Sequence, residues 1–334
     1  MKKKVRAFVA EKKIYVLLLL LCGNVMMFAD GLTATLQHGT TMTAYFGQSA
    51  LQSAYEAAAD GDIITLSPGG FNPVTDIAKS VRIVGAYGVT STAYTTFLNA
   101  AFTISADNVK LEGMYFQSAV TLGAIKNCTI KRCYIESLQQ SGTHTNTLID
   151  QCVLKYDYAV ETGVNYGIKN TTIQCFRAMN TTDNVANITN CMIWYFVWSG
   201  TYTRPYAVYK NNILGLRASG STTYAYSENS PSEYYNNYLF RLNSSTTGYV
   251  SSLLFAAGCI NSGNTYSGNT SITSYTETYP NKMAITLNEE VVGITGGEGF
   301  NEYPAIPRVL TASIDAQTDD KGKLNASITV QAEK

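Results

Sequence analysis

The chain has 334 residues, of which 14% are charged, and its 24 Lys and Arg balance its 24 Asp and Glu. A neutral, weakly charged surface has no electrostatic attraction for a phosphate backbone, so we expect no nucleic-acid partner. The 24 tyrosines, together with many Thr, Ser and Asn, are typical of strands and polar turns and not of helices.

Residues 1–29 have the pattern of a signal peptide. Basic residues from Lys2 to Lys13 precede an apolar run at residues 14–21, which is shorter than the about 20 residues of a membrane span. We expect cleavage after Ala29 and an exported protein of the cell surface, periplasm or extracellular space, with no transmembrane segment in the mature chain. A lipid anchor at Cys22 is the alternative to plain cleavage.

A short helix and the first strands are predicted next. Leu51, Tyr55 and Ala58 form an apolar stripe at helical spacing. Residues 61–66 (GDIITL) then predict a turn that leads into a strand, and residues 80–85 (SVRIVG) predict the strand of a second coil.

A 19-residue repeat follows. Its first marker is an asparagine at equal spacing, at Asn108, Asn127, Asn146, Asn165 and Asn184. Each of the first four is followed three places later by an aliphatic residue, and two places after that aliphatic comes a bend residue. The bend residues are Gly113, Arg132, Gln151, Asn170, Asn190, Asn211 and Asn236. Because Asn and Gly tolerate left-handed backbone, the repeat predicts coils of strand, sharp corner and strand.

The residues around each corner alternate in the way that strands require. The aliphatic residue before the bend and the residues one and three places after it face one interior. No coil buries its apolar face alone, so the coils stack about 4.8 Å apart into a solenoid. Equivalent Asn side chains are then close enough to hydrogen-bond along the stack. The predicted fold class is all-β, a parallel β-helix.

Residues 51–71, LQSAYEAAADGDIITLSPGGF, are similar to the N-terminal end of the pectin-lyase-like superfamily. In that family an amphipathic helix covers the first coil, and a Gly-Asp turn leads into the first strand. The resemblance covers about residues 45–285. It implies a right-handed parallel β-helix with an N-terminal capping helix, in a domain of residues 30–290. It implies no single activity, because the superfamily contains lyases, hydrolases, esterases, adhesins and inert surface proteins.

Residues 291–334 break the repeat and predict a C-terminal β-rich cap or tail. Residues 293–308 are rich in turn formers, and residues 310–332 predict two strands around the turn at 319–322. This ending resembles those of exported bacterial β-helix proteins, in which it covers the open last coil. We expect the same here, because an exposed coil edge promotes aggregation.

The cysteines indicate buried thiols. Seven Cys, less Cys22 of the signal peptide, leave six, and Cys133, Cys152 and Cys191 share one inward position of the repeat. Equivalent Cβ atoms on adjacent coils lie about 4.8 Å apart, whereas a disulfide prefers about 3.8 Å. We therefore favour free thiols over a bridge. The two His of the chain lie near no paired Cys motif, so we expect no metal site.

Glu112, Lys131, Asp150 and Lys169 each follow the aliphatic residue of four successive coils. One interpretation is a solvated ladder of ion pairs, worth about 0.2–1 kcal/mol per contact. The other is a catalytic strip, since uronate lyases of the superfamily use Lys or Arg bases and acidic Ca²⁺ ligands. We favour the ladder, because each acid has a basic neighbour and a Ca²⁺ site needs several converging acidic oxygens. Ca²⁺ is expected only with the lyase interpretation, and otherwise no cofactor is expected.

Aromatic residues gather in one part of the chain. Both tryptophans and nine tyrosines lie between residues 194 and 238. Trp194 follows the inward Ile193 and is therefore expected to face outward. Such rings stack on sugar rings while their polar tips remain hydrated, although packing between loops or inside enlarged coils is the alternative. The candidate glycan-binding residues are Trp194, Tyr195, Trp198 and Tyr209.

Two classes of function are compatible with these features. The first is an exported, non-catalytic β-helix protein that contacts carbohydrate, and we expect it to be a monomer. The alternative is a polysaccharide lyase or glycoside hydrolase acting on a uronate-containing glycan. The sequence has no Gly-His-Gly and no acidic pair within the coils, and Arg204-Pro205 is only a fragment of the pectate lyase signature. We therefore favour the non-catalytic class.

Overall fold

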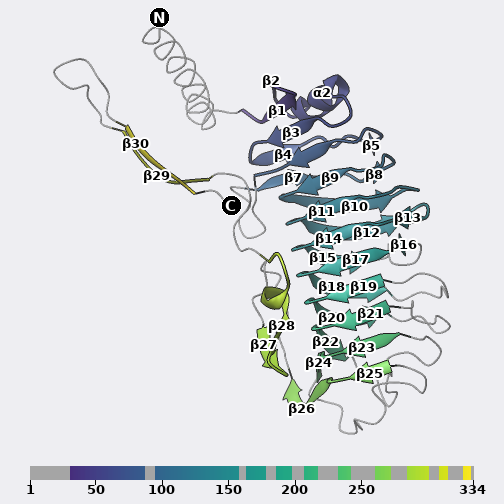
Figure 1. The fold of residues 1–334 in the computed structure, drawn as a ribbon. Coiled ribbons are helices and arrows are strands. Elements are labelled where there is room, and N and C mark those ends of the chain that lie inside the picture. Colours follow the sequence, from purple (N-terminus) through teal and green to yellow (C-terminus); the bar gives the residue numbers. More distant parts are fainter. Residues whose placement is uncertain are drawn as a thin grey trace, which may run out of the picture.

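The computed structural model describes residues 31–86, 95–157, 163–177, 186–197, 207–216, 232–241, 260–271, 284–300, 308–314 and 326–331. It is a parallel β-solenoid whose coils stack along one axis (Figure 1). The predicted all-β fold with stacked parallel coils is confirmed. The predicted signal peptide lies outside the described residues. Within the described ranges, no helix is long and apolar enough to cross a membrane.

Two twelve-stranded sheets, A and B, form the walls of the solenoid. Sheet A contains, in spatial order, β2 (Thr41–Phe46), β1 (Thr33–His38), β3 (Ile63–Leu66), β6 (Arg82–Val84), β9 (Lys110–Glu112), β11 (Thr129–Lys131), β14 (Leu148–Asp150), β17 (Tyr166–Lys169), β19 (Ala186–Thr189), β21 (Ala207–Lys210), β23 (Glu233–Tyr235) and β25 (Ile260–Ser262). From β3 onward these strands pair in parallel, whereas β1 is antiparallel to both β2 and β3.

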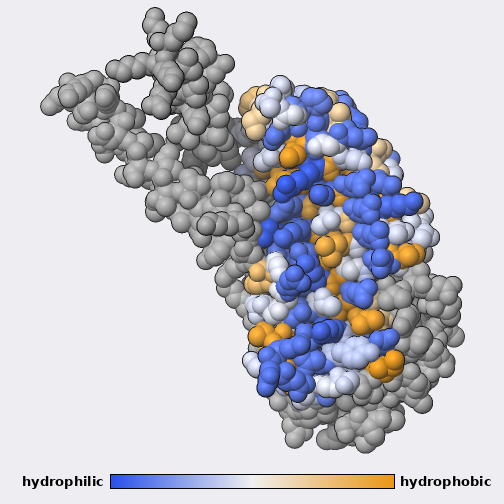
Figure 2. Space-filling model, in the orientation of Figure 1, coloured by the Kyte–Doolittle hydropathy of each residue, from blue (hydrophilic) through white to orange (hydrophobic). Residues whose placement is uncertain are grey.

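From β9 onward, sheet B contains the strand that follows each sheet A strand after the bend residue of the coil. Its main path contains β26 (Thr265–Ser271), β24 (Tyr238–Arg241), β22 (Ile213–Leu216), β20 (Met192–Val197), β18 (Thr172–Arg177), β15 (Val153–Asp157), β12 (Tyr134–Gln140), β10 (Met114–Leu122), β7 (Thr96–Leu98) and β4 (Gly69–Phe71). Off this path, β8 (Phe102–Ile104) pairs with β10, and β5 (Asp76–Ile77) pairs with β8. A short third wall pairs β13 (His144–Thr145) with β16 (Gly163–Val164). On the face in Figure 2, hydrophilic residues run in bands along the stack with hydrophobic residues between them.

The predicted helix is α2 (Ala50–Ala57), and it closes the N-terminal end of the core (Figure 1). Leu51 and Tyr55 are buried in the core, as their spacing predicted. Three carbonyl groups at the end of the helix accept hydrogen bonds from Lys79 Nζ, at distances of 2.8, 3.0 and 2.8 Å. These bonds add donors to carbonyl groups at the end of the helix, where the Tyr55 carbonyl also accepts from the Ala58 N–H at 3.2 Å.

The corners between sheets A and B are left-handed, as the repeat predicted. The bend residues have positive φ, for example 52° at Arg132, 56° at Gln151 and 51° at Asn170. A second corner contains the 19-residue asparagines, among which Asn127, Asn146 and Asn165 each donate a side-chain hydrogen bond to the preceding Asn, at 3.2, 3.1 and 2.9 Å. The predicted stacking of asparagines is therefore confirmed at this corner. Asn184 lies outside the described residues.

A second ladder of amides runs inside the solenoid, directly after the corner. Asn212, Asn237 and Asn264 occupy, on the later coils, the inward position that Cys133, Cys152 and Cys191 occupy on the earlier ones. The Asn212 Nδ2 group donates to Asn237 Oδ1 at 3.0 Å, and Asn237 Nδ2 donates to Asn264 Oδ1 at 2.9 Å. Asn212 and Asn237 are fully buried. Sequence reasoning followed the corner asparagines and missed this ladder one residue later.

Cys128, Cys133, Cys152 and Cys191 are buried free thiols. Cys133 and Cys152 lie on adjacent coils, where the Cys133 N–H donates to Cys152 Sγ at 3.4 Å. Burial raises the pKa of Cys128 to about 11 and that of Cys191 to about 12. These two thiols are thus held protonated, and all four cysteines act as small apolar side chains.

We therefore expect alkylation and peptide mapping to recover free thiols at Cys133 and Cys152. In the folded protein both should react slowly, because burial keeps the reagent away from them. Under denaturing, non-reducing conditions both should be labelled in full. Recovery of few or no free thiols from denatured protein would show that a disulfide forms after all.

The tail begins with the hairpin β27 (Ala284–Leu287) and β28 (Glu290–Gly293), followed by the 3₁₀ turn η4 (Ile294–Gly296). The sequence predicted that residues 291–334 cover the open last coil, and much of that range lies outside the described residues. Residues 284–300 run back along the side of the stack, over the corner between sheets A and B. Side chains of the corner residues donate to tail carbonyl groups, from Asn236 to Leu287, Asn190 to Val291 and Gly293, Asn170 to Glu298, and Gln151 to Gly299.

These contacts explain why the later corner residues do not all stack on one another. Asn190 and Asn170 direct their amides to the tail, whereas Asn236 still donates to Asn211 Oδ1 at 3.0 Å. Val292 and Ile294 of the tail pack on Met192 and Ile213 of sheet B. Beyond the tail segment, β29 (Arg308–Ile314) and β30 (Ala326–Gln331) form an antiparallel pair, which confirms the two predicted strands.

Candidate functional site

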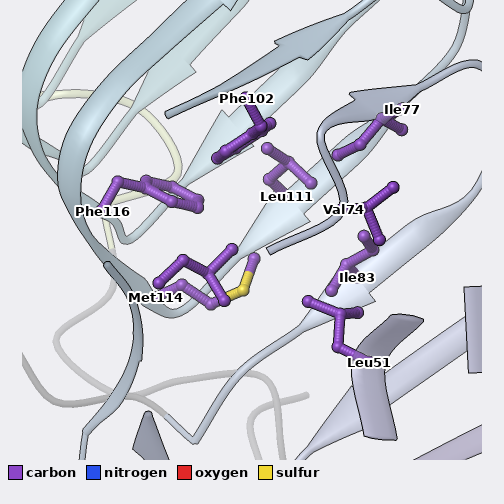
Figure 3. Close-up of a pocket in the computed structure, with 9 residues that line it drawn as sticks. Leu51, Val74, Ile77, Ile83, Phe102, Leu111, Met114 and Phe116 are labelled. Atoms are coloured by element: carbon purple, nitrogen blue, oxygen red, sulfur yellow. The ribbon is translucent and has the colours of Figure 1, made fainter. Parts of the chain in front are cut away.

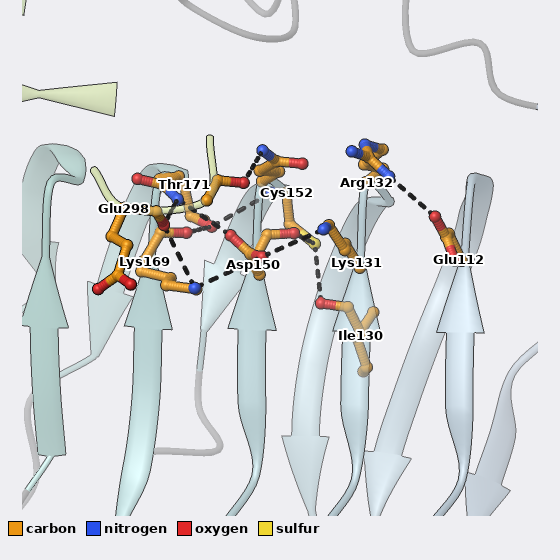
Figure 4. Close-up of polar contacts among 12 residues, drawn as sticks. Glu112, Ile130, Lys131, Arg132, Asp150, Cys152, Lys169, Thr171 and Glu298 are labelled. Atoms are coloured by element: carbon orange, nitrogen blue, oxygen red, sulfur yellow. Dashed lines mark hydrogen bonds and ion pairs between the residues drawn. The ribbon is translucent and has the colours of Figure 1, made fainter. Parts of the chain in front are cut away.

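The charged line predicted from the sequence lies at the corner end of sheet A. Register pairs Glu112 with Lys131, Lys131 with Asp150, and Asp150 with Lys169 on successive coils. Asp150 Oδ2 lies 3.7 Å from Lys131 Nζ and 3.9 Å from Lys169 Nζ (Figure 4). The four residues are therefore brought together as the sequence predicted.

Glu112 lies between two arginines rather than beside a lysine alone. Its carboxylate is 2.7 Å from Arg82 Nη2 and 2.9 Å from Arg132 Nη1. The Arg132 side chain is 1% exposed although it comes from a corner with positive φ. Sequence reasoning used Arg132 only as a bend residue and missed it as an ion-pair partner. The signal was available, because no other corner position in the repeat carries a charge.

The prediction of a solvated ladder needs correction, because both acids are buried. Glu112 is 8% exposed and Asp150 is 4% exposed. The tail contacts the hydrogen-bond partner of Asp150, since Asn170 Nδ2 donates both to Asp150 Oδ1 at 3.2 Å and to the Glu298 carbonyl at 3.4 Å. Buried pairs respond to the loss of one partner more strongly than surface pairs do.

Burial raises the pKa of Asp150 above its ordinary value, although Lys169, Lys131, the Asn170 amide and Arg132 all lower it. A carboxyl with a raised pKa is a candidate general acid. Two lysines on either side of this carboxylate disfavour a cation at the same place. In the part of the chain that the structure describes, no three His, Cys, Asp or Glu side chains converge as metal ligands.

The predicted glycan-binding residues separate into three cases. Trp194 and Tyr195 lie on β20, but their side chains are outside the described set, and Trp198 is wholly outside it. Tyr209 is fully buried and stacks on Tyr234 inside the solenoid, with ring centroids 4.8 Å apart and an interplanar angle of 2°. Tyr209 is therefore not a surface contact. The sequence prediction was wrong there because position 209 belongs to the inward set.

A second aromatic surface, which sequence reasoning missed, lies on the outer face of sheet B. The partly buried Tyr115 packs edge to face on Tyr134 with centroids 4.7 Å apart, and Tyr134 itself is buried with Val153. The Tyr115 hydroxyl donates to Glu136 Oε1 at 2.8 Å, and Lys155 Nζ lies 2.9 Å from Glu136 Oε2. These residues, with Tyr156, are called the tyrosine surface below. In the sequence, this surface is signalled by two consecutive outward residues within a strand of sheet B, which on β12 are Glu136 and Ser137.

Register connects the tyrosine surface to the predicted tryptophan region. Ser137 pairs with Tyr156, Tyr156 with Cys175, and Cys175 with Tyr195. Trp194 therefore follows the inward Ile193 on β20 as Lys155 follows Leu154 on β15. The backbone therefore places Trp194 in the same column as Lys155, and Tyr195 in the same column as Tyr156.

A small cavity beneath α2 offers no chemistry of its own (Figure 3). Its lining is entirely apolar and includes Leu51 of the helix, Phe102, Leu111, Met114 and Phe116. No side chain there could orient a polar substrate. We interpret it as a packing gap between the helix and the first coils.

Comparison of the chain with protein-family models, curated proteins and solved structures gave no match. Its function must therefore be inferred from its own residues.

Proposed function

We propose that this chain is an exported, non-catalytic β-helix protein of the pectin-lyase-like superfamily, and that it contacts glycans at the cell surface or beyond it. The parallel coils and the helix over the first coil agree with that superfamily. The observation that carries the glycan proposal is the tyrosine surface, where the half-buried Tyr115 and Tyr156 lie with the partly exposed pair of Glu136 and Lys155 on the outer face of sheet B.

The chemistry of the tyrosine surface suits a sugar. The C–H face of a pyranose packs on an aromatic ring, while its hydroxyl groups need nearby donors and acceptors. Glu136 and Lys155 supply an acceptor and a donor next to Tyr115 and Tyr156. Because Tyr195 continues the Tyr156 column on β20, a glycan laid along the stack would meet successive coils.

The charged line supports a structural role rather than turnover. Each of its carboxylates already has two cationic partners and is buried. A catalytic strip must present its groups to a substrate, whereas the Asn170 amide bonds to both Asp150 and the tail carbonyl of Glu298. These ion pairs and the Asn170 hydrogen bonds instead suit a structural role, in which they hold neighbouring coils and the tail in register.

Glycan binding should depend on the outer face of sheet B. Trp194→Ala, Trp198→Ala and Tyr156→Ala should each weaken binding on a glycan array or in pull-downs, with loss at least about tenfold for Trp194, because each removes a stacking face. Tyr235→Ala is the matched control, since it removes an outward tyrosine of sheet A and should leave binding unchanged.

Binding that survives all three substitutions would refute contact by stacking at this surface. Equal loss in the Tyr235→Ala control would point to a general folding defect instead. Thermal melts of each variant distinguish that outcome, because outward aromatic residues contribute little to the coil core.

One observation favours the alternative of a polysaccharide lyase or glycoside hydrolase, namely the raised pKa of Asp150. In that case Asp150→Asn or Lys131→Ala would leave glycan binding intact and stop turnover. The measurement is product release from uronate-containing glycans, with and without Ca²⁺. We expect no turnover in the parent protein, and turnover that disappears in either variant would overturn the non-catalytic proposal.

A further inference from the structure

The first strand pair carries an edge that no described strand covers. Strand β2 ends sheet A, with β1 on one side and no described partner on the other. Natural edge strands are usually protected by Lys, Pro or a bulge. Strand β2, TMTAYF, has no charge and no proline, and its pairing with β1 is regular over all six residues.

One face of β2 is apolar and exposed, whereas the exposed Thr41 and Thr43 lie on the other face. Phe46 is 73% exposed and Met42 is 66% exposed, with Ala44 exposed between them. Because side chains alternate, these three share a face, while Tyr45 on the opposite face packs against the core.

The same three residues also present the free backbone groups of the edge. Gly47 N–H donates to the Leu32 carbonyl at 2.8 Å, so position 47 points its backbone at β1. Backbone direction alternates along an antiparallel strand, so Tyr45 and Thr43 also point at β1. The N–H and C=O groups of Met42, Ala44 and Phe46 therefore point away from it, to the open edge.

We propose that this edge binds the β2 strand of a second copy of the chain, antiparallel and about a two-fold axis at Ala44. An axis perpendicular to the sheet keeps the exposed faces of both copies on one side. It pairs Ala44 with Ala44 and Met42 with Phe46 of the other copy. All three are then hydrogen-bonded pairs, so the two strands form about six N–H···O=C bonds.

The strand is thus complementary to itself in backbone and in side chains. In this register Met42 of each copy packs beside Phe46 of the other. No like charges face each other, since β2 has no charged residue. The resulting dimer is isologous and joins two solenoids at their N-terminal ends, with sheet A continuous through both. The sequence alone favours a monomer, so the proposed dimer differs from that expectation, and it does not depend on glycan binding.

The test uses the purified protein expressed from the 334-residue sequence. Sedimentation equilibrium over micromolar concentrations should give a dimer. Ala44→Pro removes an edge N–H and no bond to β1, so the variant should fold as the parent does and weaken dimerisation at least about tenfold. Circular dichroism and a thermal melt check the fold. A monomeric parent, or a folded Ala44→Pro protein that dimerises as before, would overturn the proposal.

Cross-linking provides a second readout that does not need the proline variant to fold. Two Ala44→Cys residues would have Cα atoms about 5.5 Å apart, within reach of a disulfide. Thr41→Cys is the matched control, because the two Thr41 positions would be about 20 Å apart in this register. Under mild oxidation a covalent dimer should form from Ala44→Cys and not from Thr41→Cys. Equal or absent cross-linking in the two variants would contradict the register.

Discussion

Asn237→Leu should lower the free energy of unfolding by about 3–5 kcal/mol, because it breaks the internal amide ladder in its middle. The Asn237 side chain accepts from the Asn212 N–H at 2.9 Å and from Asn212 Nδ2 at 3.0 Å, and it donates to the Tyr209 carbonyl at 2.9 Å. Leucine makes none of these bonds. The partner groups are buried, so each remains without water or a substitute.

Urea denaturation of the parent and the variant measures this loss. Asn72→Leu is the matched control, since Asn72 makes one exposed hydrogen bond of 3.4 Å to Ser49. That change should cost about 0.5 kcal/mol or less. Because stacked coils open locally, hydrogen exchange at β22 and β24 should report the Asn237 defect first. Equal stability of the Asn237 variant and the parent would mean that the ladder contributes no net stability.

Glu112→Ala should lower the free energy of unfolding by about 3 kcal/mol, because it removes the carboxylate that lies against the buried Arg132 guanidinium. Desolvation of that guanidinium is offset in the native state by Glu112, which also binds Arg82. In the variant the Arg132 guanidinium stays buried, but the carboxylate that offsets its desolvation is gone. The expected loss is several times the value of a solvated pair.

Glu136→Ala is the matched control for this prediction. Glu136 pairs with Lys155 on the surface, with side-chain exposures of 24% and 33%, so its removal should cost about 1 kcal/mol or less. Thermal and urea melts of both variants compare the two pairs directly. Equal costs would indicate that burial of Glu112 has little energetic effect. A Glu112→Ala protein that is as stable as the parent but loses turnover on a glycan would instead support the catalytic interpretation of the line.

Much of the fold was predictable because each coil repeats the same local chemistry. The apolar stripe of α2, the alternation of the strands and the left-handed Asn corners are all local features, and the structure confirms them. Within the candidate site, the column of Glu112, Lys131, Asp150 and Lys169 was predictable for the same reason. Residues at equal repeat positions must lie one above another in a stack.

The burial of that column was not predictable from the repeat. Glu112 lies against Arg132 of a corner, and Asp150 bonds to Asn170, which also bonds to residues 284–300 from the far end of the chain. Tyr209 illustrates the opposite error, since its type suggested a surface ring while its place beside Tyr234 makes it part of the core. Residue type does not decide exposure in either case.

The sequence by itself determined the coil, because alternation and tolerance of positive φ are properties of single residues and their near neighbours. Only the tertiary structure decided that the tail lies along the corner and that Arg132 binds Glu112 from beneath the surface. It alone revealed that no described strand pairs with the outer edge of β2 and that Met42 and Phe46 are exposed there. Each of these depends on which segments distant in sequence occupy the same space, and a local pattern contains no information about that.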